Sequence, residues 1–292
     1  MVKISAHGVI LSLAYVAGLG TVAYFAAGGL SYYLTPLIQR PRHPLYWMLK
    51  PGGELGQTFG LIGCVMMVAM LAYSLRKRLR ILRRLGPLRI WLDYHILLGV
   101  CGPLLVILHS SFKVGGLVSL SFWSMIAVAL SGVLGRFLYR QIPRSPSGDE
   151  LSPAEARARD RELTRALIGG LGLDAETAGR VGEIAAEGLT PDRSLPSLFA
   201  DVTVGQFSLR WRLRRFLRRR GRDTAGRRFR RRLEKAVLDK ARWHRRIVLW
   251  NRLRELFHYW HVFHKPFALI MYLFMILHVV VAWRTGYGWP GG

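Results

Sequence analysis

Two apolar stretches of the chain each carry a pair of histidines fourteen residues apart. His95 and His109 lie in DYHILLGVCGPLLVILHSSF, and His264 and His278 lie in HKPFALIMYLFMILHVVVAW. At about 100° per residue, fourteen residues bring a helix back to within about 40° of its starting face. Each pair therefore shares one helix face, and its two imidazoles lie roughly 21 Å apart along the axis.

Such pairs are suited to holding planar iron macrocycles between two helices. If the helices run parallel, His95 meets His264 at one level and His109 meets His278 at the other. Each meeting supplies two axial nitrogens to one haem, whose tetrapyrrole fills the other four iron positions. Zinc would need three or four protein ligands at one point. The chain has no CxxCH motif for covalent attachment, so we predict two b-type haems.

The remaining histidines leave alternatives open. A histidine within an apolar helix can also hydrogen-bond to a neighbouring helix or line a proton path. His261 is an alternative to His264 as a ligand if the helix begins irregularly there. His258 is expected beside the membrane surface, and His7 and His244 are expected in water or at the interface.

Long apolar runs predict the elements that must position these residues. A membrane helix needs roughly 20 apolar residues, and helices satisfy their own backbone hydrogen bonds in lipid. Five segments qualify: Gly8–Leu30, Gly56–Leu75, Trp91–Phe112, Leu117–Leu138 and Tyr259–Trp283. We interpret the first as an uncleaved helix rather than a signal peptide, because its apolar run is longer than a usual signal core.

The predicted fold is an all-α, polytopic membrane bundle of about five transmembrane helices with a helical, arginine-rich insertion. The expected parts are residues 1–140 with four spans, the insertion at 141–257, and residues 258–292 with the fifth span. Cys64 and Cys101 lie inside apolar runs and are interpreted as small buried side chains. Gly99, Gly102 and Ala268 are expected to let a flat cofactor approach the backbone, although such small residues are also ordinary in membrane helices.

The distribution of charge predicts the orientation. The formal net charge is +26, and 15 of the 17 acidic residues lie between residues 141 and 257. Basic residues gather at 76–89 and in the insertion, and the basic side of a membrane protein is normally cytoplasmic. We expect an integral protein of a bacterial inner membrane, with the N-terminus and residues 141–257 cytoplasmic and the C-terminus outside.

The insertion has two parts of different composition. Residues 144–192 are rich in Ala, Glu and Arg, and SPAEARARDREL is typical of a capped helix start. Residues 208–254 hold 20 Lys and Arg with interleaved apolar residues. That pattern favours helices lying on an anionic membrane surface or against an acidic partner. Membrane lipid is favoured over nucleic acid as the partner.

The paired histidines, with HSSF closing the first pair and WHVFHKP opening the second, resemble dihaem membrane cytochromes b. Respiratory cytochrome b and the membrane domains of ferric reductases and NADPH oxidases share this arrangement. The resemblance covers about residues 55–140 and 255–285. It implies His95, His109, His264 and His278 as axial ligands and transmembrane electron transfer as the activity.

The chain departs from that family in two ways, which limit the properties that the resemblance implies for it. Ferric reductases and NADPH oxidases continue into a flavin- and nucleotide-binding region, whereas only nine residues follow Trp283 here. The arginine-rich insertion matches no cytochrome b pattern. We therefore expect electrons to be exchanged with a quinone or with iron–sulfur, flavin or c-type cytochrome subunits.

The leading functional prediction is an electron-transfer subunit that links a quinone pool to partner redox proteins, with no complete active site of its own. Two histidines on each iron leave no open position for oxygen or substrate. Lys265 and residues 76–89 could neutralise haem propionates on one side, and Lys113 or Arg284 on the other. The alternatives are a membrane component of a ferric or oxygen reductase and a non-haem, proton-relay transporter.

Overall fold

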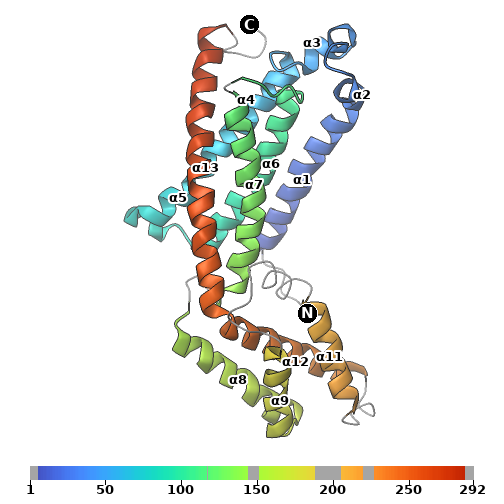
Figure 1. Cartoon of the computed structure of the whole chain (residues 1–292), viewed down its shortest axis with the longest axis vertical. Coiled ribbons are helices and arrows are strands. Elements are labelled where there is room, and N and C mark those ends of the chain that lie inside the picture. The colour runs from blue at the N-terminus through green and yellow to red at the C-terminus, as the bar shows by residue number, and fades with distance from the viewer. Residues whose placement is uncertain (1–5, 117, 144–150, 188–204, 220–226, 287–292) are drawn as a thin grey trace. The chain divides into compact units, whose positions relative to one another are not determined.

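The computed structural model describes residues 6–116, 118–143, 151–187, 205–219 and 227–286, and no strand occurs among them (Figure 1). The helices are α1 (Ala6–Gly28), α2 (Leu30–Leu34), η1 (Arg40–Arg42), α3 (Tyr46–Leu49), α4 (Glu54–Ala69), α5 (Leu71–Arg78), η2 (Arg80–Arg84), α6 (Leu88–Ser110), α7 (Val118–Gln141), α8 (Pro153–Leu171), α9 (Ala175–Ala186), α11 (Gly205–Arg219), α12 (Arg227–Val248) and α13 (Trp250–Arg284). The predicted all-α fold is confirmed.

Within this described part, five helical segments are long and apolar enough to cross a membrane. They are Ala6–Gly28, Tyr46–Arg78, Leu88–Ser110, Val118–Gln141 and Trp250–Arg284. The fifth helix begins nine residues before the predicted Tyr259. Hydropathy marks only the apolar part of a helix, whereas the preceding WNRLRELFH consists largely of residues that also favour helix.

The chain divides into two compact units. One contains residues 1–136 and 260–292, and the other contains residues 137–259. We call the first the membrane unit and the second the basic unit.

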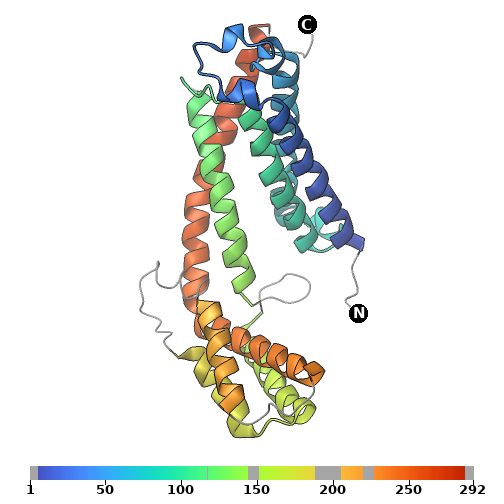
Figure 2. The same cartoon turned by 90° about the vertical axis from the view of Figure 1, so that its right-hand side faces the viewer.

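In the membrane unit, α4 packs along α6, and α1 and α5 also pack against α6 (Figures 1 and 2). Glycines on α4 make the close approach possible. A Cβ added at Gly63 would come within 2.8 Å of the Val106 side chain and 3.1 Å of the Gly102 carbonyl. Small residues at such positions let helix backbones pack closely in a membrane.

The end of α6 is held by a buried arginine. The Arg40 guanidinium donates to the carbonyl of Ser111, and to those of Thr35 and Tyr33 at 2.8 Å each. Ser111 itself has a positive φ of 48° and donates through its hydroxyl to the Leu49 carbonyl at 2.7 Å. A cation at a helix C-terminus also interacts favourably with the helix dipole. These bonds fix the turn that directly follows His109.

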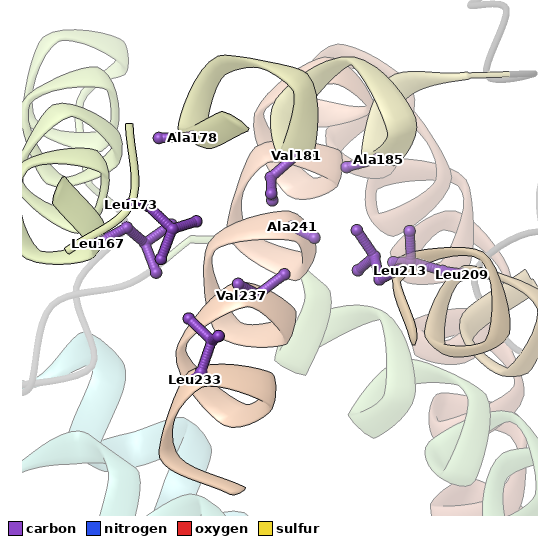
Figure 3. Close-up of a cluster of buried hydrophobic side chains, with 10 residues drawn as sticks. All are labelled: Leu167, Leu173, Ala178, Val181, Ala185, Leu209, Leu213, Leu233, Val237 and Ala241. Carbon is purple, nitrogen blue, oxygen red and sulfur yellow. The ribbon is translucent and has the colours of Figure 1, made fainter. Parts of the chain in front are cut away.

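The basic unit has its own hydrophobic core. Its members come from α8, the connection to α9, α9, α11 and α12, and they are Leu167, Leu173, Ala178, Val181, Ala185, Leu209, Leu213, Leu233, Val237 and Ala241 (Figure 3). The leucines of α11 and the apolar side of α12 therefore pack into protein. The expectation that residues 208–254 lie on an anionic membrane surface or against an acidic partner concerns the side of these helices that the core leaves outside.

The start of α8 has the predicted cap. Ser152 Oγ accepts from the Glu155 amide at 3.2 Å, and Glu155 returns the contact by accepting from the Ser152 amide at 2.7 Å. The hydrogen bonds from the Ser152 backbone, and then from its side chain, lower the pKa of Glu155. This reciprocal capping box starts the helix where the sequence SPAE indicates.

Candidate haem-binding site

The rotation of α13 in the membrane unit is fixed by three polar contacts. Tyr272 donates its hydroxyl to the Met67 carbonyl of α4 at 2.6 Å. Ser121 of α7 donates to the Met271 carbonyl at 3.1 Å. Trp260 donates its indole N–H to the Ser131 carbonyl at 2.7 Å. These contacts turn the face with His264 and His278 toward the interior of the unit.

His109 and His278 form one facing pair. Their ring centroids are 6.2 Å apart, and the ring planes make an angle of 59°. Metal–imidazole bonds are about 2 Å long and each nitrogen lies about 1 Å from its ring centre, so two imidazoles on opposite faces of one metal have centroids about 6 Å apart. The observed separation fits a bis-imidazole haem.

A glycine on α4 makes room for His109. A Cβ added at Gly60 would lie 2.7 Å from His109 Nδ1, which is closer than real side-chain contacts allow. One turn earlier, the Gly56 carbonyl lies 2.8 Å from the same nitrogen. Because a carbonyl can only accept, His109 Nδ1 carries the proton and its Nε2 has the lone pair that would be available to a metal.

His95 and His264 are the proposed second pair, and each lies fourteen residues before its counterpart, His109 or His278. His95 Nδ1 lies 3.2 Å from the Met70 carbonyl, so it too donates from Nδ1. The helices α6 and α13 run in the same direction: α7 contacts Asp93 through Arg136 and His264 through Ser131, whereas His109 faces His278.

Ser131 of α7 fixes the tautomer of His264. Its hydroxyl donates to the Val128 carbonyl at 2.9 Å and lies 2.7 Å from His264 Nδ1. With its proton committed to Val128, the Ser131 oxygen accepts from His264 Nδ1–H. The Nε2 of His264 is then the nitrogen that would be available to a metal. Metal-binding histidines are usually held through their other ring nitrogen in this way.

Sulfur-containing side chains fill the interior between the two histidine levels. Met67, Met125, Met271 and Met275 form a buried cluster, against which Cys64 and Tyr272 pack. Cys64 Sγ lies 3.8 Å from Met275 Sδ. Met271 and Met275 lie between His264 and His278 on the same helix face. The unbranched, polarizable side chains suit packing in an irregular space, such as that beside a flat cofactor.

A buried ionic cluster forms around Asp93 of α6, and the sequence did not predict its partners. Asp93 is buried and accepts from Arg136 of α7 at 2.7 Å. Its other oxygen lies 3.3 Å from His7 Nε2 of α1. His7 was expected in water or at the interface, and its partner is 86 residues away. Such a pair can be identified only when the contact between α1 and α6 is known.

The small and basic residues that were singled out beside the histidines have the following surroundings. Gly102 faces α4, where an added Cβ would lie 3.3 Å from the Met67 side chain, and Gly99 faces Met70 at the end of α4. Both glycines allow close packing at this side of α6. Lys113 and Arg284 are exposed.

His261 and His264 both lie near the Trp260 ring. The Trp260 ring centroid is 4.6 Å from that of His261 and 4.7 Å from that of His264. His264 is held by Ser131, whose Oγ lies 2.7 Å from His264 Nδ1. The geometry favours His264 as the partner of His95.

The donor set matches axial ligation more closely than a clustered metal centre. In the described part of the chain, no group of three or more His, Cys, Asp or Glu side chains is placed to hold a metal ion. Zinc requires such a group, whereas a haem needs only two axial ligands. Comparisons of the chain with protein-family models, with curated proteins and with solved structures find no match.

Proposed function

We propose that the chain is a dihaem b-type cytochrome subunit that carries electrons across a membrane between a quinone pool and partner redox proteins. The observation that carries the proposal is that α6 and α13 each present two histidines fourteen residues apart. The His109 and His278 rings face each other at a centroid separation of 6.2 Å, and His95 and His264 lie fourteen residues before them on the same two helices. A bound haem at each level would supply reversible one-electron chemistry.

The residues of this chain would set how those groups behave. The carbonyls of Gly56 and Met70 and the hydroxyl of Ser131 hold three imidazoles by Nδ1. Such bonds orient the ring and raise the basicity of the metal-binding nitrogen. Because both axial positions would be filled by this chain, substrate has no open position, and the role is to relay electrons.

The proposed location is a bacterial inner membrane with the basic loops in the cytoplasm. The sequence RKRLRILRRLGPLR and the basic unit together carry most of the arginines, which supports this orientation by the positive-inside tendency. The proposed partners are a quinone and iron–sulfur, flavin or c-type cytochrome subunits.

Electron flow across a bilayer tests this function. Purified chain is reconstituted into liposomes that contain trapped dithionite, and ferricyanide is added outside. Loss of ferricyanide colour is expected to be at least about tenfold faster than in empty liposomes, because the two haems together cover most of the hydrocarbon thickness. The double variant His109→Ala/His278→Ala is the matched control and should return the rate to that of empty liposomes.

Two other outcomes would contradict the proposal. Haem-loaded wild-type chain that passes electrons no faster than empty liposomes would refute transmembrane electron transfer while leaving haem binding intact. Proton uptake by a haem-free, folded chain, without ferricyanide reduction, would instead favour the proton-relay transporter.

A further inference from the structure

Helix α11 of the basic unit has one face that is committed to the protein core. Leu209 and Leu213 are each 1% exposed and pack with residues of α9 and α12 (Figure 3). Phe216 packs partly against the same core. Because these three residues lie within about 60° of one another around the helix, they fix which side of α11 points outward.

The opposite side of α11 carries two large aromatic residues. Phe207 and Trp211 are one turn apart and are 75% and 61% exposed. At about 100° per residue, both lie close to 180° from the centre of the core-facing side. The apolar pattern of α11 is therefore split, with leucines in the core and aromatics outside it.

Exposed arginines flank these aromatics. Arg210, Arg214 and Arg215 are all exposed. The Arg215 guanidinium lies over the Trp211 ring, 5.3 Å from its centroid, and Arg214 pairs with Glu234 of α12 at 3.2 Å. We call these three arginines with Phe207 and Trp211 the outer face of α11.

We propose that the outer face of α11 docks onto the anionic phospholipid headgroups of the membrane that the chain spans. Tryptophan and phenylalanine insert at the headgroup boundary, and arginines bind lipid phosphates there. Each basic residue near an anionic leaflet contributes about fivefold to the affinity. The chemistry of the face thus matches that of an acidic lipid surface.

Chain connectivity favours lipid over another acidic partner. The basic unit is joined at both ends to candidate membrane spans, since α7 ends at Gln141 and α13 begins at Trp250. Tethering keeps its effective concentration at the bilayer high. A nucleic acid would also offer phosphates and stacking surfaces to this face, but it would have to be recruited from solution.

Helix α12 provides a matched comparison on the same unit. Its exposed cations include Arg231, Arg232 and Lys235. Its apolar residues Leu233 and Val237 are buried in the core. The side of α12 with these three cations therefore lacks an exposed aromatic pair like that of α11.

The experiment uses the full chain in lipid nanodiscs. A fluorophore is attached to a cysteine introduced at the exposed Ser208 of α11, and in a second protein at Lys235 of α12. Unsubstituted chain is the labelling blank, since Cys64 and Cys101 lie within candidate spans. Quenching by nitroxide-bearing lipid is measured in phosphatidylcholine nanodiscs with and without phosphatidylglycerol, at 0.1 M and 1 M salt.

Quenching at residue 208 is expected to rise with phosphatidylglycerol and to fall at 1 M salt, where the screening length is only about 3 Å. The substitutions Arg210→Gln, Arg214→Gln and Arg215→Gln together should weaken docking on the order of 100-fold. Phe207→Ser/Trp211→Ser should also abolish the quenching. Removal of the three α12 cations Arg231, Arg232 and Lys235 should reduce it less.

Equal quenching with and without phosphatidylglycerol would overturn the proposal. A second contradicting result is that phosphatidylglycerol leaves the quenching unchanged, while added single-stranded RNA changes the fluorescence of the label at residue 208. That result would assign the face to nucleic acid. Haem content is measured on the same samples, so that failure to dock is distinguished from failure to bind haem.

Discussion

Replacement of His109 by alanine is expected to remove one of the two haems and to leave the other in place. His109 and His278 face each other at a centroid separation of 6.2 Å, and a b-type haem is held by its axial ligands and surrounding packing alone. His278→Ala should give the same loss, because it removes the opposite ligand of the same iron. The b-type absorbance per chain should fall by about half.

The controls for this prediction are two other histidines of α13, His258 and His261. His258→Ala and His261→Ala should keep both haems, since His264 is the residue bonded to Ser131. His264→Ala should remove the haem that the His109 variant retains, so that the double variant His109→Ala/His264→Ala is colourless. Loss of haem on His261→Ala with retention on His264→Ala would transfer the ligand role to His261.

Replacement of Arg136 by methionine is expected to destabilise the membrane unit by about 3 kcal/mol. Arg136 donates to Asp93 at 2.7 Å, and the Asp93 side chain is only 9% exposed. Without the guanidinium, a buried carboxylate loses its principal charged partner, which is costly in a medium of low dielectric. The melting temperature of detergent-solubilised protein should fall by roughly 5–10 °C.

The companion substitution Asp93→Asn separates charge from shape. In the Arg136→Met background it should recover most of the lost stability, because the buried group is then neutral. Asp93→Asn alone should leave haem content intact. Two results would show that the ion pair does not stabilise this region. One is an Arg136→Met variant with the melting temperature of the wild type, and the other is a double variant that is no more stable than Arg136→Met.

The elements that sequence predicts well in this chain are those set by local pattern. Runs of about 20 apolar residues locate the spans, and a fourteen-residue interval identifies two histidines on one helix face. The cap at Ser152 is equally local, since it needs only the next three residues. In each case the residues that decide the structure are neighbours along the chain.

The surroundings of the histidines depend instead on contacts between distant segments. Nothing in the sequence around Ser131 marks it as the partner of His264, 133 residues away. Gly60 is one of 31 glycines, and its role emerges only because the His109 ring lies against it. Asp93 stands near the start of the predicted span Trp91–Phe112, but the sequence does not show that Arg136 of α7 is its partner.

The arginine-rich helices show a second kind of limit. The amphipathic pattern of residues 208–254 correctly indicates helices with an apolar side. The same pattern serves a helix on lipid and a helix on a protein core. In the structure Leu213 and Val237 meet inside one core, and the aromatics left outside it, Phe207 and Trp211, could be separated from the leucines only once that core was located.

The proposed function assigns one haem to each of the two imidazole pairs, and a pyridine haemochrome assay counts the haems. The purified chain should contain about two b-type haems per polypeptide. Its reduced-minus-oxidised spectrum should be that of iron with two imidazole ligands. A chain that is fully folded, with its helical content and its α13 contacts intact, but colourless after expression with ample haem, would contradict the account.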